Sequence, residues 1–211
     1  MHEELILTGD ILANLTLSDI VDVFSKSGTP KATKVKQIKY RDEYQPATDY
    51  YRTLRTSLVE IHSQGKDRAA LDTIVPSLTD PKKTSNYSEL VEAYRKFWGR
   101  KDIGWFTPPR GSYSFSQIDV LVNPELGLII DGKPVVVKLY LKGDDVSKAQ
   151  INLIPVLMEV VLRPQVSNGA LMALLDVRKG KMHFLGTSSI SAATAMINAE
   201  LSYVATLWPT L

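Results

Sequence analysis

A lysine lies in the middle of one apolar run, and an aspartate lies in an alternating run before it. Lys138 follows three valines in PVVVKLYLK (134–142). Asp119 alternates with branched apolar residues in YSFSQIDVLV (113–122). Carboxylate oxygens are ligands that magnesium prefers, and an ammonium group can neutralise charge that builds on a phosphate oxygen. The two side chains therefore fit phosphate chemistry if the fold brings them together.

Strands and tight turns must position these residues. Period-two patterns and turn residues predict three strands joined in sequence, over 113–122, 126–131 and 134–142. The turn between the last two is DGK (131–133), because Asp-Gly is a strong hairpin signal. A helix over 145–163, opened by Asp144 or Asp145, should follow. The run 168–177 is apolar on both faces and is expected to be a central strand, followed by a hairpin strand and a helix over 188–208.

The first half of the chain reads as helical and charge-rich. Helical spacing and capping residues predict helices over 15–28, 29–41, 45–65, 68–78 and 86–100. Ser18 is the expected cap of the first, and Asn86 with Glu89 gives the last a start that resembles a capping box. We therefore expect a helical N-terminal region over residues 1–85 and a core domain over residues 86–211.

The order of helix, three-strand meander, helix and strand over about residues 86–185 resembles the core of the PD-(D/E)XK nuclease-like superfamily, the restriction-endonuclease-like fold. The resemblance implies an α/β (α+β) fold with an acid near the second strand and an (Asp/Glu)-x-Lys unit on the third. In that superfamily the two acids hold magnesium, and the lysine stabilises the attacking water or the charge on the phosphate. Asp119 and Lys138 match, but Val136 stands where the second acid belongs.

A displaced acid would complete such a site. Glu159 on the following helix is the first candidate, with Glu125 and then Glu92 after it. The resemblance thus implies Lys138, Asp119 and Glu159 as catalytic residues and Asp119, Glu159 and Glu125 as ligands of magnesium, if the site is active. Two simpler interpretations stand beside it: Lys138 and Lys142 line a solvent face or an edge, or Asp119 pairs with a lysine across the strands.

Two other segments could contact partners. A basic segment contains Lys31, Lys34, Lys36, Lys39 and Arg41. It could bind nucleic acid, DNA rather than RNA, or be a solvated helix face. The C-terminal helix has Glu200 as its one charged residue, so it packs on the core or joins two copies of the chain. The favoured function is a nucleic-acid-associated relative of the nucleases, active or with a degenerate site; the alternative is a non-catalytic, oligomeric scaffold.

Composition narrows the choice of chemistry. The 211 residues include no cysteine, which excludes disulfides, thiolate zinc sites and a cysteine nucleophile. The three histidines, His2, His62 and His183, share no ligand spacing, so neither a histidine metal site nor a serine triad is expected. The net charge of +2 does not by itself indicate a polyanionic partner. We expect a cytoplasmic protein without a signal peptide or membrane span.

Overall fold

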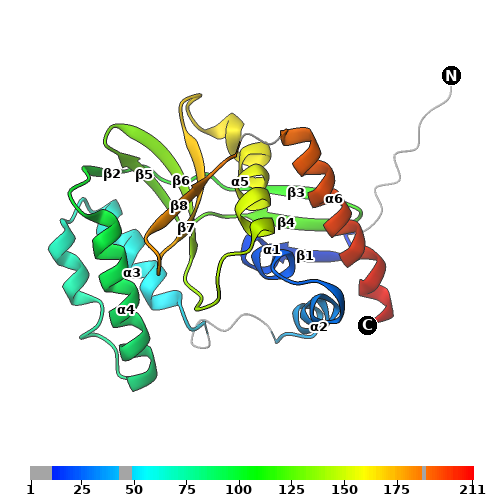
Figure 1. Ribbon diagram of the computed structural model, residues 1–211, viewed down its shortest axis with the longest axis horizontal. Helices are drawn as coiled ribbons and strands as arrows, with labels where there is room; N and C mark the ends of the chain where they lie inside the picture. Colours follow the sequence, from blue (N-terminus) through cyan, green and yellow to red (C-terminus); the bar gives the residue numbers. More distant parts are fainter. Residues whose placement is uncertain (1–10, 43–48, 187–188) are drawn as a thin grey trace.

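Two sheets and the helices around them make up the protein, which confirms the predicted α/β class (Figure 1). The computed structural model describes residues 11–42, 49–186 and 189–211. The main sheet has the order β2-β5-β6-β7-β8, with strands Ile103–Trp105, Leu126–Ile130, Lys133–Tyr140, Leu171–Asp176 and Lys181–Phe184. The small sheet has the order β1-β4-β3, with strands Ala13–Thr16, Ile118–Val122 and Gly111–Phe115.

Six α-helices are described, and they lie on both sides of the main sheet (Figure 1). They are α1 (Leu17–Phe24), α2 (Gly28–Lys39), α3 (Arg52–Ser63), α4 (Pro81–Trp98), α5 (Lys148–Leu162) and α6 (Ile190–Leu207). A 3-10 helix over Arg68–Thr73 replaces the helix that was expected over 68–78. No helix in the described ranges is both long and apolar enough to cross a membrane.

The main sheet has the predicted order of elements but a different first strand. β2, β5 and β6 form the antiparallel meander, α5 makes the crossover, and β7 runs parallel to β6. The predicted first strand, 113–122, belongs instead to the small sheet. It folds back on itself as the β3–β4 hairpin. Its turn is formed by Ser116 and Gln117, which both have positive φ (50° and 63°), and neither is a typical residue for that conformation.

This turn gives a stability prediction. Gln117→Gly should raise the free energy of unfolding by up to about 1 kcal/mol, because a left-handed backbone costs about 1–2 kcal/mol with a side chain and little with glycine. The matched control is Gly132→Ala in the β5–β6 turn, where φ is +79° and the change should destabilise the protein. Urea unfolding of the two variants checks both signs. Destabilisation by Gln117→Gly would mean that the glutamine side chain supports the turn.

Alternate residues of β6 face two separate cores. Val135, Val137 and Leu139 pack in the core under α3 and α4, while Val136 and Tyr140 pack in the core with α5. The second core also includes α1, α2, α6 and the small sheet, so residues 13–39 share a core with residues 190–207. The cores therefore do not divide at residue 85. The division into a helical N-terminal region, 1–85, and a core domain, 86–211, stays a prediction.

Helix caps differ from three sequence expectations. Thr16 caps α1 through a capping box with Asp19, so Ser18 is not the cap. α4 begins at Pro81 with Asp80 as its cap, five residues before Asn86. Ser147, with Gln150, caps α5 in place of Asp144 or Asp145. Because Thr16 takes the cap position, the Ser18 hydroxyl is available for a contact elsewhere.

Candidate functional site

Lys138 is buried at the centre of the main sheet. β6 lies between β5 and β7, and Lys138 is 3% exposed, so the interpretation of a solvent-facing or edge lysine is wrong. Its ammonium group donates to Glu125 Oε1 at 2.5 Å and to Ser18 Oγ at 3.0 Å. A buried ammonium group requires such partners, because an unpaired charge in the interior is costly.

Glu125 precedes β5 and is held on both oxygens. Its Oε2 accepts from the Leu139 N–H at 2.8 Å while Oε1 accepts from Lys138. The Glu125 N–H in turn donates to the Val137 carbonyl at 3.1 Å. The carboxylate is thus fixed to β6 by a side chain and by the backbone, which leaves it little freedom to bind a further group.

A two-residue turn explains this pairing. Asp131 and Gly132 both have positive φ and form the loop of the β5–β6 hairpin, so Ile130 pairs with Lys133 and Leu126 with Val137. One further step along this register places Glu125 opposite Lys138. A sequence argument that took the loop as the two residues Asp131 and Gly132, instead of the three residues 131–133, would have predicted the pair of Glu125 with Lys138.

The Lys138–Glu125 pair lines a cavity of about 130 Å³ between the main sheet, α1 and the start of α3. α1 contributes Ser18, Asp19 and Asp22, and the start of α3 contributes Tyr51 and Arg55. A second hollow, of about 430 Å³, shares Asp22, Tyr140 and Lys142 with the first. Its other lining residues include Lys26, Lys34 and Gln150.

Asp22 links the two hollows electrostatically. It forms ion pairs with Lys142 and, at 2.8 Å, with Lys34. Burial alone would raise the pKa of Asp22, but the hydrogen bonds from Lys142 and Lys34 outweigh burial and hold its pKa below the ordinary value. Burial, together with Asp144 and Asp22, raises the pKa of Tyr140 to about 12, so its phenol stays protonated at neutral pH.

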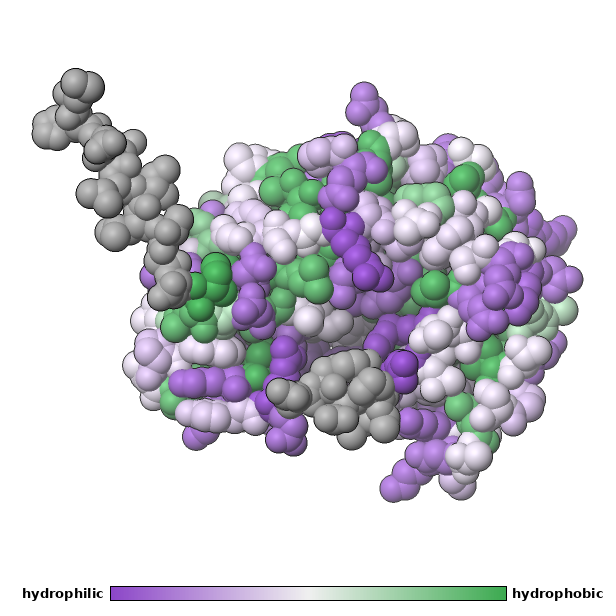
Figure 2. All heavy atoms as spheres, turned by 180° about the vertical axis from the view of Figure 1, so that it is seen from behind, coloured by the Kyte–Doolittle hydropathy of each residue, from purple (hydrophilic) through white to green (hydrophobic). Residues whose placement is uncertain are grey.

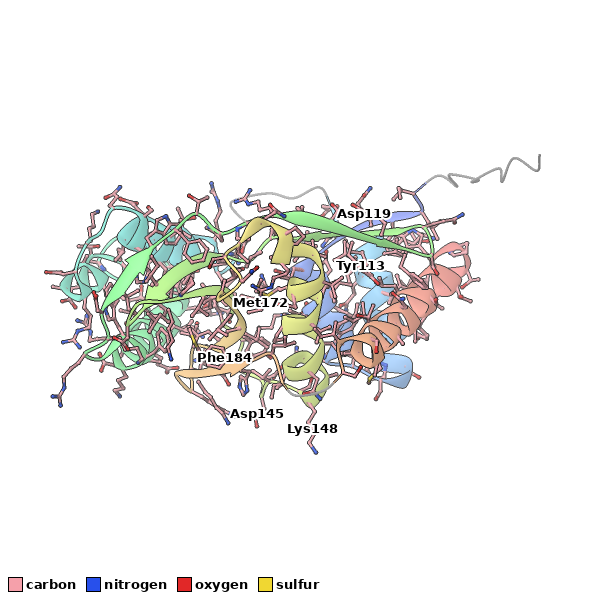
Figure 3. All side chains as sticks on the ribbon, turned by 90° about the horizontal axis from the view of Figure 1, so that it is seen from above. Tyr113, Asp119, Asp145, Lys148, Met172 and Phe184 are labelled. Carbon is pink, nitrogen blue, oxygen red and sulfur yellow. The ribbon has the colours of Figure 1, made fainter. Side chains whose placement is uncertain are left out.

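The structure does not bring Asp119 or Glu159 to Lys138. Asp119 lies on β4 in the small sheet, where its Oδ1 accepts from Ser114 Oγ at 2.6 Å. In Figure 3, α5 stands between Asp119 and Met172 of β7. Glu159 forms a two-point ion pair with Arg163, at 2.6 and 2.7 Å. Neither acid lines the cavity beside Lys138, so the predicted cross-strand pair of Asp119 with Lys138 is wrong. The predicted catalytic roles of Asp119 and Glu159 stay untested.

The other acids named from the sequence also have partners or positions of their own. Glu92 forms an ion pair with Arg95 at 3.4 Å on α4. Asp131 occupies the β5–β6 turn and accepts from the Asp102 N–H at 3.0 Å. Of the candidate acids, Glu125 alone lines the cavity with Lys138.

These residues do not fit a magnesium site. Val136 is fully buried in the apolar core, and both Glu125 oxygens are engaged. Within the described ranges, no group of three or more histidine, aspartate or glutamate side chains could hold a metal ion. Magnesium ordinarily needs carboxylates that are free to accept it. Magnesium binding stays a prediction tied to an active site, and it would require a carboxylate other than these.

Most of the basic segment holds the fold together. Lys31 pairs with Glu200, Lys34 with Asp22, and Arg41 with Asp19. Lys39 donates to the carbonyls of Trp208 and Leu211, at 2.6 and 3.0 Å. These contacts tie α2 to α1, to α6 and to the C-terminal residues. Lys36 and Arg41 are the exposed members of the set, and Lys36 takes part in none of these contacts.

Sequence reasoning did not identify Ser18 and Asp22 as residues of the site. Ser18 reaches Lys138 across 120 residues of chain, and Lys142 reaches Asp22 across the same separation. Both belong to an amphipathic helix, and its pattern predicts that the polar residues face solvent. No local spacing pattern links them to β6, because the link is made by the packing of α1 on the sheet.

Comparison with known proteins shows no family for this chain. No protein-family model and no curated protein match the chain. The crystal structure of a protein named "Putative exonuclease" from Eubacterium rectale aligns with 93% of this chain and 82% of its own. The TM-score is 0.49 and the sequence identity 11%. Similarity at this level says nothing about activity.

Proposed function

We propose that this chain is a nucleic-acid-associated protein with a restriction-endonuclease-like core and a degenerate site, which binds without cutting. The observation that carries the proposal is the Lys138–Glu125 pair in the cavity under α1, with Val136 buried in the core beside it. The lysine is on the third strand of the meander and the acid at the start of the second. The pair supplies the lysine and one acid of the superfamily's catalytic set, and the second acid is missing.

The order of the elements supports the core assignment. α4 precedes the antiparallel strands β2, β5 and β6, and α5 crosses to the parallel strand β7. Lys138, held by Glu125 and Ser18, then fixes α1 against the sheet as well as lining the cavity. In this arrangement the lysine acts as a structural link, because its ammonium group joins Glu125, next to β5, to Ser18 of α1.

Lysines on α2 and near the second hollow are the proposed phosphate contacts. Lys26 and Lys36 are exposed, and no ion pair in the described ranges involves either of them. Lys26 lines the second hollow beside Lys34 and Lys142. On the face drawn in Figure 2, hydrophilic and hydrophobic residues are interspersed. We therefore propose weak, local contacts rather than a broad basic surface.

A cleavage assay tests the degenerate site. We expect no cutting of single- or double-stranded DNA or RNA in magnesium or manganese by the purified chain. Lys138→Ala and Glu125→Gln should leave that result unchanged. Metal-dependent cutting that both variants abolish would overturn the proposal and show an active nuclease. Val136→Glu then asks whether an added carboxylate on the Lys138 face creates activity.

A binding assay tests the nucleic-acid partner separately. Affinity for labelled DNA and RNA should fall as salt rises, and each lost phosphate contact should lower the slope by about 0.9 for duplex DNA. Lys26→Ala with Lys36→Ala should weaken binding severalfold. The matched control is Lys96→Ala on α4, where the side chain is 76% exposed. Absence of binding, with a clear oligomer by light scattering, would favour the scaffold alternative.

A further inference from the structure

An apolar row crosses four strands of the main sheet where α4 stops covering it. Ile130 of β5, Val135 of β6, Leu171 of β7 and Phe184 of β8 belong to this row. Val135 pairs directly with Leu171, and Phe184 pairs with Ala173, which is buried on the same face as Val135. The side chains of the row therefore project from the face that α3 and α4 cover elsewhere.

The row forms the floor of an open groove. The groove has a volume of about 400 Å³ and is also lined by Met182 and by Phe97 near the C-terminal end of α4. Leu171 is 42% and Phe184 43% exposed, which is unusual for large apolar side chains next to a core. Figure 3 shows Phe184 on β8, which is the last strand of the main sheet in the described ranges. The nuclease-like site uses none of these residues.

Two lysines give the groove a positive border. Lys101 and Lys133 line it, and no ion pair in the described part of the chain involves either one. Lys101 contacts the Phe97 carbonyl and lies over the Phe97 ring, so its ammonium group is held at the groove. The one acid in the lining, Asp131, accepts from the Asp102 N–H within its turn. The border therefore complements carboxylates in a bound segment.

We propose that this groove docks an amphipathic helix of a partner protein, with carboxylates beside its apolar face. Strands lie about 4.8 Å apart, so a row across four strands spans roughly 14 Å, which accommodates one helix of about 10 Å diameter. Helices α3 and α4 already cover the same face, so a bound helix would extend that layer over Leu171 and Phe184. Lys101 and Lys133 would then meet the carboxylates and orient the helix.

A synthetic helix serves as the probe. We would use a fluorescein-labelled peptide of about 18 residues, with leucines on one face and glutamates beside them, and a matched peptide with lysines in place of the glutamates. Fluorescence polarisation should show binding of the glutamate peptide, and a Kd at least about 5-fold higher for the lysine peptide. Lys133→Glu should reduce or reverse the difference in Kd between the two peptides.

Variants of the floor locate the binding. Leu171→Asp and Phe184→Asp change exposed positions, and each should weaken binding by about 10-fold or more. Ile129→Asp is the control. Ile129 is also partly exposed, at 37%, but it projects from the opposite face of β5, because its neighbours Leu128 and Ile130 project to the groove side. Equal binding by all three variants, or no binding by the unchanged protein, would overturn the proposal. Self-association that Phe184→Asp abolishes would also overturn it and identify a second copy as the occupant.

Discussion

Lys138→Met should lower the free energy of unfolding by about 3–5 kcal/mol, the largest effect we expect from a single substitution in this chain. The change removes the ammonium group from Glu125, whose carboxylate is mostly buried and then keeps only the Leu139 N–H. An uncompensated buried charge is the cause of the loss, since methionine replaces most of the lysine's apolar volume. Urea denaturation at neutral pH measures it.

Two further variants separate charge from packing. Lys142→Met removes an ammonium group that is 44% exposed, and its partner Asp22 keeps Lys34, so it should cost less than about 1 kcal/mol. The double variant Lys138→Met with Glu125→Gln should recover much of the loss, because no buried charge remains. If Lys138→Met alone costs no more than Lys142→Met, the pair does not hold α1 and the sheet together as described.

Acid should destabilise the protein through His62. This histidine is buried between α3 and α4, stacks on Trp98 and shares a 2.7 Å hydrogen bond with the Tyr94 hydroxyl. Its Nδ1 is buried and has no hydrogen-bond partner among the residues that the structure describes. Burial lowers the pKa of His62 from 6.5 to about 4 in the folded protein. The neutral ring is therefore the form that the folded state accommodates.

The sign of the pH effect follows from these two pKa values. Well above pH 6.5 neither state binds the proton, so the contribution of His62 to stability is fully present. As pH falls from 6.5 towards 4, the unfolded chain takes up the proton and the folded chain does not, so stability falls. Between about pH 7.5 and 5 the expected loss is roughly 2 kcal/mol.

Urea unfolding over that pH range checks the effect. His62→Phe keeps an aromatic ring on Trp98 and should make stability nearly independent of pH in this window, whatever its stability at neutral pH. His183→Phe is the control. The pKa of His183 is also lowered by burial, but its side chain is only partly buried, so this variant should keep most of the slope. An unchanged slope in His62→Phe would assign the acid sensitivity to other groups.

Turn chemistry decided how much of the fold could be predicted. The Asp131–Gly132 turn was readable, since both residue types accept positive φ, and it correctly placed β5 and β6. Ser116 and Gln117 adopt the same kind of backbone without a glycine, so the sequence pattern predicts one strand where the structure has the β3–β4 hairpin. That single error moved Asp119 into the main sheet and made it the expected acid.

The site itself was half accessible to sequence reasoning. The parity of β6 placed Lys138 and Val136 on one face, and hairpin register could have placed Glu125 opposite Lys138. Burial of Lys138 could not be predicted, because it depends on α1 covering the sheet. The packing of α1 brings Ser18 and Val21 to residues more than 100 positions away, and no periodic pattern encodes such a contact.

The parallel pairing of β1 with β4 has a consequence for the newly made chain. β1 and α1 have their partners in β4, β6 and α5, and the Ser18 contact to Lys138 spans 120 residues. At about 5–20 residues per second, a ribosome needs roughly 6–24 s to make that length. During this time the apolar side chains of α1, among them Leu17, Ile20 and Phe24, have no β6 or α5 to cover them. Until β6 and α5 have been made, the apolar face of α1 is therefore exposed on the new chain and open to non-native contacts.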